Sequence, residues 1–215
     1  MNMLSYLFPI TLFKGKTAMN TKVEVRELFG VRKLDLDGYP QSGLIYQKYW
    51  KNIFFKLKID EMSNVGNALI LGLGGGDLAK IFEKIKPLWK TTFIEIEPEI
   101  IFVAKKYFGI DNTIKRTIVI GDAKDYMTYN RSRYDIVIVD LYSGDSVPKF
   151  VTALNFLEQV SQALSLNGIA IFNYASHSFR ENDFTIFTRQ LLKIFTKVEQ
   201  CKYKEHPYFI AKLPK

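Results

Sequence analysis

Hydrophobic and polar positions alternate in the first 60 residues in the way that is typical of β-strands. The segments TKVEVREL and VRKLDLDG alternate on either side of Gly30, which predicts a β-hairpin. The cluster DGYPQSG predicts a turn, and the aromatic segment LIYQKYWKNIFFKLK predicts a helix. Residues 1–60 are therefore expected to form a small N-terminal β-hairpin appendage and a connecting helix.

After residue 61, short apolar runs alternate with amphipathic stretches. The runs ALIL, TTFIEI, TIVI, YDIVIVD and GIAIFNY predict buried strands, and TALNFLEQVSQALSLNG predicts a helix that ends near Gly168. Two more strands are expected in the tail, joined around His206 and Pro207. Buried strands that alternate with helices indicate a parallel sheet covered on both faces. Residues 61–215 are thus predicted to form a Rossmann-like, doubly wound, mostly parallel α/β domain with an antiparallel C-terminal edge hairpin.

Composition is that of a globular protein with a substantial core. The chain has 215 residues, of which 47% are hydrophobic and 14% aromatic. The segment MLSYLFPITLF is interpreted as a strand rather than an export signal, because it lacks a charged start and a small-residue cleavage site. No apolar run reaches the length of a membrane span, and the single cysteine, Cys201, allows no intramolecular disulfide. A cytoplasmic protein without membrane association is expected.

Charge and metal-ligand content argue against two further classes. The 30 basic and 22 acidic residues give a net charge of +8, but the basic residues form no dense block. Solvated helix faces explain this charge better than a nucleic-acid partner does. Two histidines and one cysteine, far apart in the chain, do not provide a usual zinc set, so no metal is expected.

The stretch GLGGG directly follows the first apolar strand of the second part. Glycines at positions 72, 74 and 76 permit positive φ and leave no Cβ between the backbone and a ligand. The helix that is expected to begin near Asp77 offers free amides at its N-terminus. Asp77 stands where the last glycine of the dinucleotide fingerprint would be, and tight strand–helix packing is the alternative interpretation. Gly72, Gly74 and Gly76 are candidates for binding a nucleoside cofactor.

Acidic residues follow each of the next three strands, at the sheet edge where such folds bind ligands. Glu95 and Glu97 are expected to point to opposite faces, and Glu95 is preferred as the group that accepts both ribose hydroxyls. Asp122 is either an acceptor for an adenine amino group or a helix N-cap. Asp140 is either a base acting on an amine or a group that orients the substrate. His177 lies near the same edge, as a general base or as a structural loop histidine.

These motifs, in order, resemble the spermidine synthase family within the class I adenosylmethionine-dependent transferase fold. The matching stretches are KLDLDGYPQSG, the pair Tyr46-Gln47, ALILGLGGGDL, FIEIEPEIIFVAKKYF, VIGDAKDYM and YDIVIVDLYSGDSVP. The resemblance extends from about Thr21 to Leu213. It implies transfer of an aminopropyl group from decarboxylated S-adenosylmethionine to a polyamine-type amine.

The resemblance also implies roles for individual residues. Glu95 would hold the ribose, Asp122 the adenine, and Asp140 would deprotonate the attacking amine. Gln41 would belong to the donor site. Residues expected on the substrate side are Tyr46, Gln47, Ser143 and Asp145. The partners implied are a small-molecule amine acceptor and a second copy of the chain in a homodimer.

Three departures from the family pattern remove negative charge from a site meant for a cation. Gly75 stands where the family has an aspartate in the glycine turn, and Ser143 stands in place of a second aspartate, with Asp145 as a substitute nearby. The stretch between Gln41 and Tyr46 carries no acid, whereas the family has an acidic pair. Two alternatives therefore stay open: a methyltransferase that uses intact S-adenosylmethionine, and a nucleoside-binding protein without catalysis.

Overall fold

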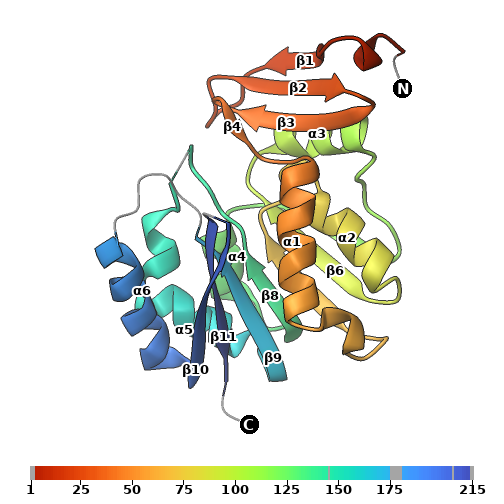
Figure 1. Ribbon diagram of the computed structural model, residues 1–215. Helices are drawn as coiled ribbons and strands as arrows, with labels where there is room; N and C mark the ends of the chain where they lie inside the picture. Colours follow the sequence, from red (N-terminus) through yellow and green to blue (C-terminus); the bar gives the residue numbers. More distant parts are fainter. Residues whose placement is uncertain (1–2, 145, 175–180, 205, 214–215) are drawn as a thin grey trace.

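The N-terminal part is a four-stranded antiparallel sheet followed by a long helix. The computed structural model of the protein describes residues 3–144, 146–174, 181–204 and 206–213. Strands pair in the order β1-β2-β3-β4, and β2 and β3 form the expected hairpin around Gly30. Figure 1 shows this sheet at one end of the molecule, with α1 running from it along the larger domain. The bounds are η1 (Met3–Tyr6), β1 (Ile10–Gly15), β2 (Val23–Leu28), β3 (Val31–Leu36), β4 (Tyr39–Pro40) and α1 (Leu44–Lys56).

The larger part contains a seven-stranded sheet in the order β10-β11-β9-β8-β5-β6-β7. Neighbours from β9 to β7 pair in parallel, whereas β10, β11 and β9 pair antiparallel. The predicted mostly parallel sheet with an antiparallel C-terminal edge hairpin is confirmed. The strands are β5 (Asn67–Leu71), β6 (Lys90–Glu95), β7 (Arg116–Ile120), β8 (Tyr134–Val139), β9 (Leu164–Asn173), β10 (Lys197–Tyr203) and β11 (His206–Lys212).

Helices cover both faces of this sheet and bury two hydrophobic cores. Alternate residues of β5 serve opposite cores: Ala68 and Ile70 pack with α1, α2 and α3, while Leu69 and Leu71 pack with α4, α5 and α6. This double burial explains why the strand is continuously apolar. The helices are η2 (Ile59–Glu61), α2 (Asp77–Ile85), α3 (Pro98–Phe108), α4 (Ala123–Tyr129), η3 (Lys149–Thr152), α5 (Leu154–Gln162) and α6 (Glu181–Ile194).

The helix predicted to end near Gly168 is shorter than expected. It ends at Gln162, and β9 already begins at Leu164, which is fully buried and pairs with Tyr134. The register then shifts before Ile169 pairs with Ile136, so the residues between form a bulge. A Cβ at Gly168 would lie 2.8 Å from the carbonyl oxygen of Tyr134, which explains the glycine inside this strand.

Other boundaries follow the predicted pattern with small differences. His206 and Pro207 belong to β11 itself rather than to the turn before it. The aromatic residues of α1 face inward: Tyr49, Trp50, Ile53 and Phe54 are all buried. The division of the chain at residue 60 stays a prediction.

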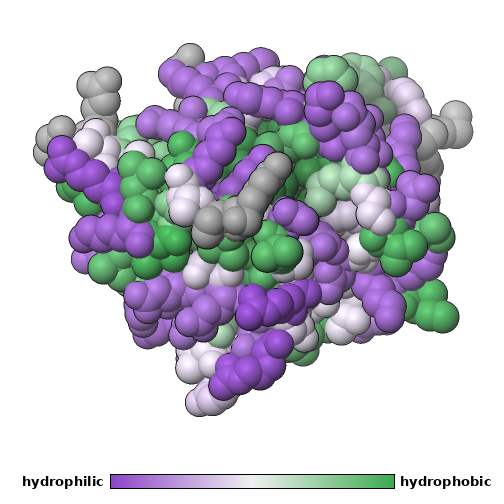
Figure 2. All heavy atoms as spheres, turned by 90° about the horizontal axis from the view of Figure 1, so that it is seen from below, coloured by the Kyte–Doolittle hydropathy of each residue, from purple (hydrophilic) through white to green (hydrophobic). Residues whose placement is uncertain are grey.

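The surface is mixed in character. In Figure 2, hydrophilic residues are spread over the whole visible face and surround scattered hydrophobic ones. Among the described helices, none combines the length and the apolar character that crossing a bilayer requires.

Candidate functional site

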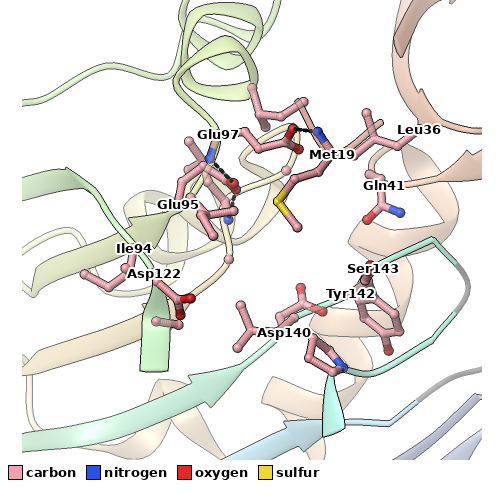
Figure 3. Close-up of a pocket in the computed structure, with 18 of the residues that line it drawn as sticks. Met19, Leu36, Gln41, Ile94, Glu95, Glu97, Asp122, Asp140, Tyr142 and Ser143 are labelled. Carbon is pink, nitrogen blue, oxygen red and sulfur yellow. Dashed lines mark hydrogen bonds between the residues drawn. The ribbon is translucent and has the colours of Figure 1, made fainter. Parts of the chain in front are cut away.

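A cavity of about 290 Å³ lies at the C-terminal ends of β5, β6, β7 and β8. Its size is at the lower end of the range for small-molecule sites, about 300–1,000 Å³. Figure 3 shows the side chains of Glu95, Asp122 and Asp140 around this hollow, with Gln41 and Met19 from the N-terminal part on the other side. Parallel strands bring these residues together because their carboxyl ends share one edge of the sheet.

The glycine turn forms part of the cavity wall with bare backbone. Gly72 has a φ of 102°, and an added Cβ would lie 2.2 Å from the carbonyl oxygen of Asp140. Gly74 has a φ of 53°, and its Cβ would lie 3.2 Å from the carbonyl oxygen of Gln41. The turn is therefore held between the end of β8 and the N-terminal part, and both glycines line the cavity.

Two other glycines of this turn serve packing. Gly76, predicted to bind the cofactor, is the N-cap of α2 and does not line the cavity; its Cβ would lie 2.4 Å from Ile110 Cγ1. A Cβ at Gly75 would meet the side chain of Ser42 at 2.5 Å. Ser42 is buried and its Oγ accepts a hydrogen bond from the amide of Leu34. The space for an acidic side chain at position 75 is therefore taken by Ser42.

Glu95 is at the end of β6 and is buried beneath the glycine turn. Its Oε2 accepts a hydrogen bond from the amide of Leu73 and its Oε1 accepts one from Glu97, both at 3.1 Å. Burial raises the pKa of Glu95, and bonds from the amides of Glu97, Leu73 and Gly74 oppose part of that rise. Since a carboxylate accepts about four hydrogen bonds, Glu95 retains capacity for a ligand hydroxyl.

Glu97 lines the same cavity as Glu95, so the prediction that only one of them faces it is wrong. The two residues are two positions apart, and in extended backbone this spacing places side chains on the same face, so the expectation of opposite faces counted the period wrongly. The carboxylate of Glu97 accepts hydrogen bonds from the amide of Met19 at 3.1 Å and from Nδ2 of Asn20 at 2.6 Å. Glu97 thus anchors the loop between β1 and β2, which supplies Met19 and Asn20 to the cavity wall.

Replacing Asn20 by Ala is expected to loosen this loop. A hydrogen bond to a charged group contributes about 1.5–3 kcal/mol, so exchange of the Met19 amide hydrogen should accelerate by about tenfold or more. Hydrogen–deuterium exchange followed by mass spectrometry measures this rate. Asn130→Ala is the matched control, because Asn130 is half-buried and the hydrogen bonds given for its side chain are local and exposed, with Ser132. Equal exchange at Met19 in the wild type and Asn20→Ala would contradict the anchoring role.

Asp122 combines both of its expected positions. It is the N-cap of α4, where Oδ1 accepts a hydrogen bond of 2.7 Å from the amide of Lys124. It also lines the cavity, directly after Gly121. The N-cap bond occupies one oxygen of the carboxylate and leaves acceptor capacity on the other.

Asp140 follows β8 and lies on the cavity wall opposite Glu95 (Figure 3). Its Oδ1 accepts a hydrogen bond of 2.8 Å from Nδ2 of Asn173. Burial raises the pKa of Asp140 to about 6; the bond from Asn173 opposes that rise, and the negative charge of Asp77 adds to it. A carboxylate with such a pKa is suited to accept a proton near neutral pH.

Tyr46 and Gln47 do not line the main cavity. Tyr46 lines a separate, very small cavity with Ile45, Tyr49, Asn173 and His206. Burial, followed by the charge of Asp140, raises the pKa of Tyr46 to about 12.

Gln47 turns instead toward the start of α2. Its Nε2 donates to Asp77 Oδ1 at 2.8 Å, and the amide of Gly43 donates to Asp77 Oδ2 at 2.8 Å. Asp77 therefore fixes the N-terminal end of α1 and is not part of the main cavity wall.

Ser143 lines the main cavity together with Tyr142 and Gly144. Its amide donates to the carbonyl oxygen of Ser146 at 2.8 Å. Asp145 and His177 lie outside the described residues, so their predicted roles stay predictions.

Among the described residues, no group of three or more His, Cys, Asp or Glu side chains is arranged so that it could hold a metal ion.

Several cavity residues were missed by sequence reasoning. Correct alternation would have placed Glu97 on the same face as Glu95. Met19, Asn20 and Leu36 come from the N-terminal part, and Phe150 comes from the turn before α5. Met19 and Asn20 lie outside the matching stretches, and Leu36 is an apolar residue within one of them, so only the three-dimensional arrangement identifies these residues as part of the cavity wall.

The fold belongs to the class I methyltransferase-like class. A human methyltransferase-like protein 13, solved with SAH, is 22% identical and superposes with a TM-score of 0.69 over 79% of this chain and 82% of that chain. A probable spermidine synthase from Corynebacterium glutamicum is 16% identical, with a TM-score of 0.78 over 94% of this chain and 79% of that chain. At these identities the likeness concerns the fold.

Within that class, the chain belongs to the spermine/spermidine synthase domain family, whose model matches residues 57–209. A polyamine aminopropyltransferase from Vibrio vulnificus is 28% identical over 142 residues, which cover 65% of this chain and 47% of the relative. One from Chromobacterium violaceum is 29% identical over 163 residues, covering 75% of this chain and 59% of the relative. The chain thus spans about half the length of these curated relatives. The resemblance expected from the motifs is confirmed.

Proposed function

We propose that the protein is an aminopropyltransferase that transfers the aminopropyl group of decarboxylated S-adenosylmethionine to a small amine. The observation that carries this proposal is the position of Asp140: a carboxylate of raised pKa on the wall of a cavity whose opposite wall has the groups that a nucleoside needs. Membership of the family and the polyamine aminopropyltransferases among its relatives support the same reaction.

The cavity fits the adenosine part of such a donor. Bare backbone at Gly72 and Gly74 permits close approach, and the buried carboxylate of Glu95 would accept a hydrogen bond from a ribose hydroxyl. Asp122 would accept a hydrogen bond from the adenine amino group. Met19, on the loop anchored by Glu97, would cover the nucleoside from the N-terminal side.

The chemistry requires a neutral amine as the nucleophile. Its nitrogen lone pair would attack the methylene carbon attached to the sulfonium, and the carbon–sulfur bond would break with its electron pair going to sulfur. Before this attack, Asp140 would take one proton from the ammonium form of the acceptor, because an ammonium has no lone pair with which to attack. The products of the transfer would be a protonated secondary amine and a neutral thioether.

The tail of the donor would lie in a region with little negative charge. Ser42 takes the space of an acid at position 75, and Asp77 bonds to Gly43 and Gln47 instead. Of the described residues near this tail, Gln41 and Ser143 are neutral cavity residues that would contact it. We infer that the donor's ammonium is held here by neutral acceptors, while Asp140 serves the attacking amine.

We also propose a cytoplasmic homodimer. Exposed apolar side chains on the N-terminal part support a subunit contact there: Leu7 is 78%, Phe8 51% and Phe29 64% exposed. The buried aromatic residues of α1, in contrast, belong to the core of the subunit.

An assay with purified protein tests the proposed reaction. Decarboxylated S-adenosylmethionine and a panel of mono-, di- and triamines would be supplied, and release of 5′-methylthioadenosine would be measured by liquid chromatography. Amine-dependent release is the expected result. Methyl transfer from intact S-adenosylmethionine to an acceptor would replace this proposal with the methyltransferase alternative. Binding of both donors without turnover would replace it with the non-catalytic alternative.

A further inference from the structure

Asp140 is connected to helix α1 through a buried chain of two hydrogen bonds. Tyr49 donates its hydroxyl hydrogen to Oδ1 of Asn173 at 2.9 Å, and Nδ2 of Asn173 donates to Oδ1 of Asp140 at 2.8 Å. Tyr49 and Asn173 are only 3% and 2% exposed. They come from the connecting helix and from the end of β9, 124 positions apart in the chain.

The ionised carboxylate of Asp140 fixes the direction of both hydrogen bonds. An ionised carboxylate only accepts hydrogen bonds, so the amide of Asn173 must turn its NH2 group toward Asp140. That orientation directs the amide oxygen toward α1, where Tyr49 provides a donor. Burial raises the pKa of Tyr49 well above its usual range, so the hydroxyl keeps its proton at every pH at which the protein would work.

We propose that Tyr49 is a positioning residue for the transfer reaction, which holds the Asn173 amide in the one orientation that donates to Asp140. This inference rests on the proposed function for its catalytic meaning, but the hydrogen-bond chain exists without substrate. Losing the hydroxyl would leave a buried amide oxygen with one donor fewer, which favours rotation of the amide away from this orientation.

Other titratable and aromatic groups surround these two hydrogen bonds, and their effects on Asp140 must be distinguished from that of Tyr49. Asp140 is faced by Tyr46 from α1, by Asp77 from α2 and by Asn173 from β9. The ring of Tyr49 contacts the rings of Trp50, Tyr203, His206 and Tyr208. His206 is a second titratable group in this cluster, so the measurement must follow the carboxyl group of Asp140 itself.

The test measures the pKa of Asp140 directly, without substrate. The carboxyl carbon is followed by carbon-13 NMR during a pH titration and is assigned by its absence in Asp140→Asn. Tyr49→Phe keeps the ring and removes the hydroxyl, and the pKa of Asp140 is expected to rise by up to about one unit. In transfer assays the acidic limb of the pH–rate profile should move to higher pH as the pKa of Asp140 rises, and the effect should be mainly on kcat.

Tyr208→Phe is the matched control, because Tyr208 is equally buried in the same aromatic cluster but its hydroxyl interacts with Cys201. This control should leave the pKa of Asp140 unchanged. Asn173→Ala should raise that pKa, and adding Tyr49→Phe to it should change nothing further. The carboxyl resonance of Asp140 also distinguishes its titration from that of His206.

Tyr49→3-fluorotyrosine covers the case in which Tyr49→Phe does not fold. It retains the hydroxyl as a stronger donor and is expected to lower the pKa of Asp140. An unchanged pKa in Tyr49→Phe, or an equal change in Tyr208→Phe, overturns the inference. A shifted pKa in a protein that transfers no aminopropyl group would leave the positioning role intact and refute the proposed function instead.

Discussion

Replacing Asp140 by Asn is expected to lower turnover by about 10²–10⁴-fold, the usual contribution of a general base. The amide has nearly the same shape but does not accept the proton that the attacking amine must lose. Donor affinity should change much less, because the groups proposed to bind the nucleoside, Gly72, Glu95 and Asp122, are unchanged in this variant. Steady-state rates and calorimetric donor binding, measured on the same preparation, separate these two effects.

The pH dependence gives a second measurement of the same role. Because burial raises the pKa of Asp140 to about 6, kcat/KM of the wild type should fall as the pH decreases through about 6. Protonation removes the base, so the activity is lost on the acidic side. The residual activity of Asp140→Asn should lack this limb.

Asp125→Asn is the control for Asp140→Asn. Asp125 is an exposed acid in the first turn of α4, and it is not among the cavity residues. Its replacement changes the net charge by the same amount and should leave rates within a factor of about two, as expected for surface substitutions. Turnover by Asp140→Asn at the wild-type rate near neutral pH would exclude Asp140 as the base.

Local sequence patterns were sufficient to predict the sheet and the edge of it at which the cavity lies. Alternation identified β2 and β3, continuous apolar runs identified β5 to β8, and parallel pairing implied that Glu95, Asp122 and Asp140 end at one edge. These inferences need only the period of the side chains and the direction of the strands, and both are properties of short segments.

Contacts between distant segments were beyond such reasoning. Asn20 and Glu97 are 77 residues apart, and nothing in either neighbourhood indicates that they meet. The pair Tyr46-Gln47 was assigned to the substrate side, but Gln47 instead bonds to Asp77. Likewise Leu164 reads as part of a helix in the sequence, but strand pairing with Tyr134 outweighs that local preference.

Replacing Gly72 by Ala is expected to have the largest effect of any change in the glycine turn. The residue has a φ of 102°, which L side chains rarely adopt, and strain of this kind costs about 1–3 kcal/mol. In addition, the new Cβ would lie 2.2 Å from the carbonyl oxygen of Asp140, so the end of β8 must move away from β5. Donor binding and catalysis should both decline, because the movement displaces the base as well as the cavity wall. Thermal unfolding, donor calorimetry and turnover measure the three consequences.

Gly109→Ala separates backbone strain from this displacement. Gly109 ends α3 with a φ of 72°, but an added Cβ there meets nothing within 4 Å. This control should lose stability comparable to the strain alone, yet keep donor affinity and turnover, since Gly109 is not part of the cavity wall. If Gly72→Ala loses only as much stability as Gly109→Ala and still binds the donor normally, the close contact between the glycine turn and Asp140 does not shape the site. A selective loss of binding in Gly72→Ala, beyond the shared loss of stability, would indicate that bare backbone at this position brings nucleoside and base together.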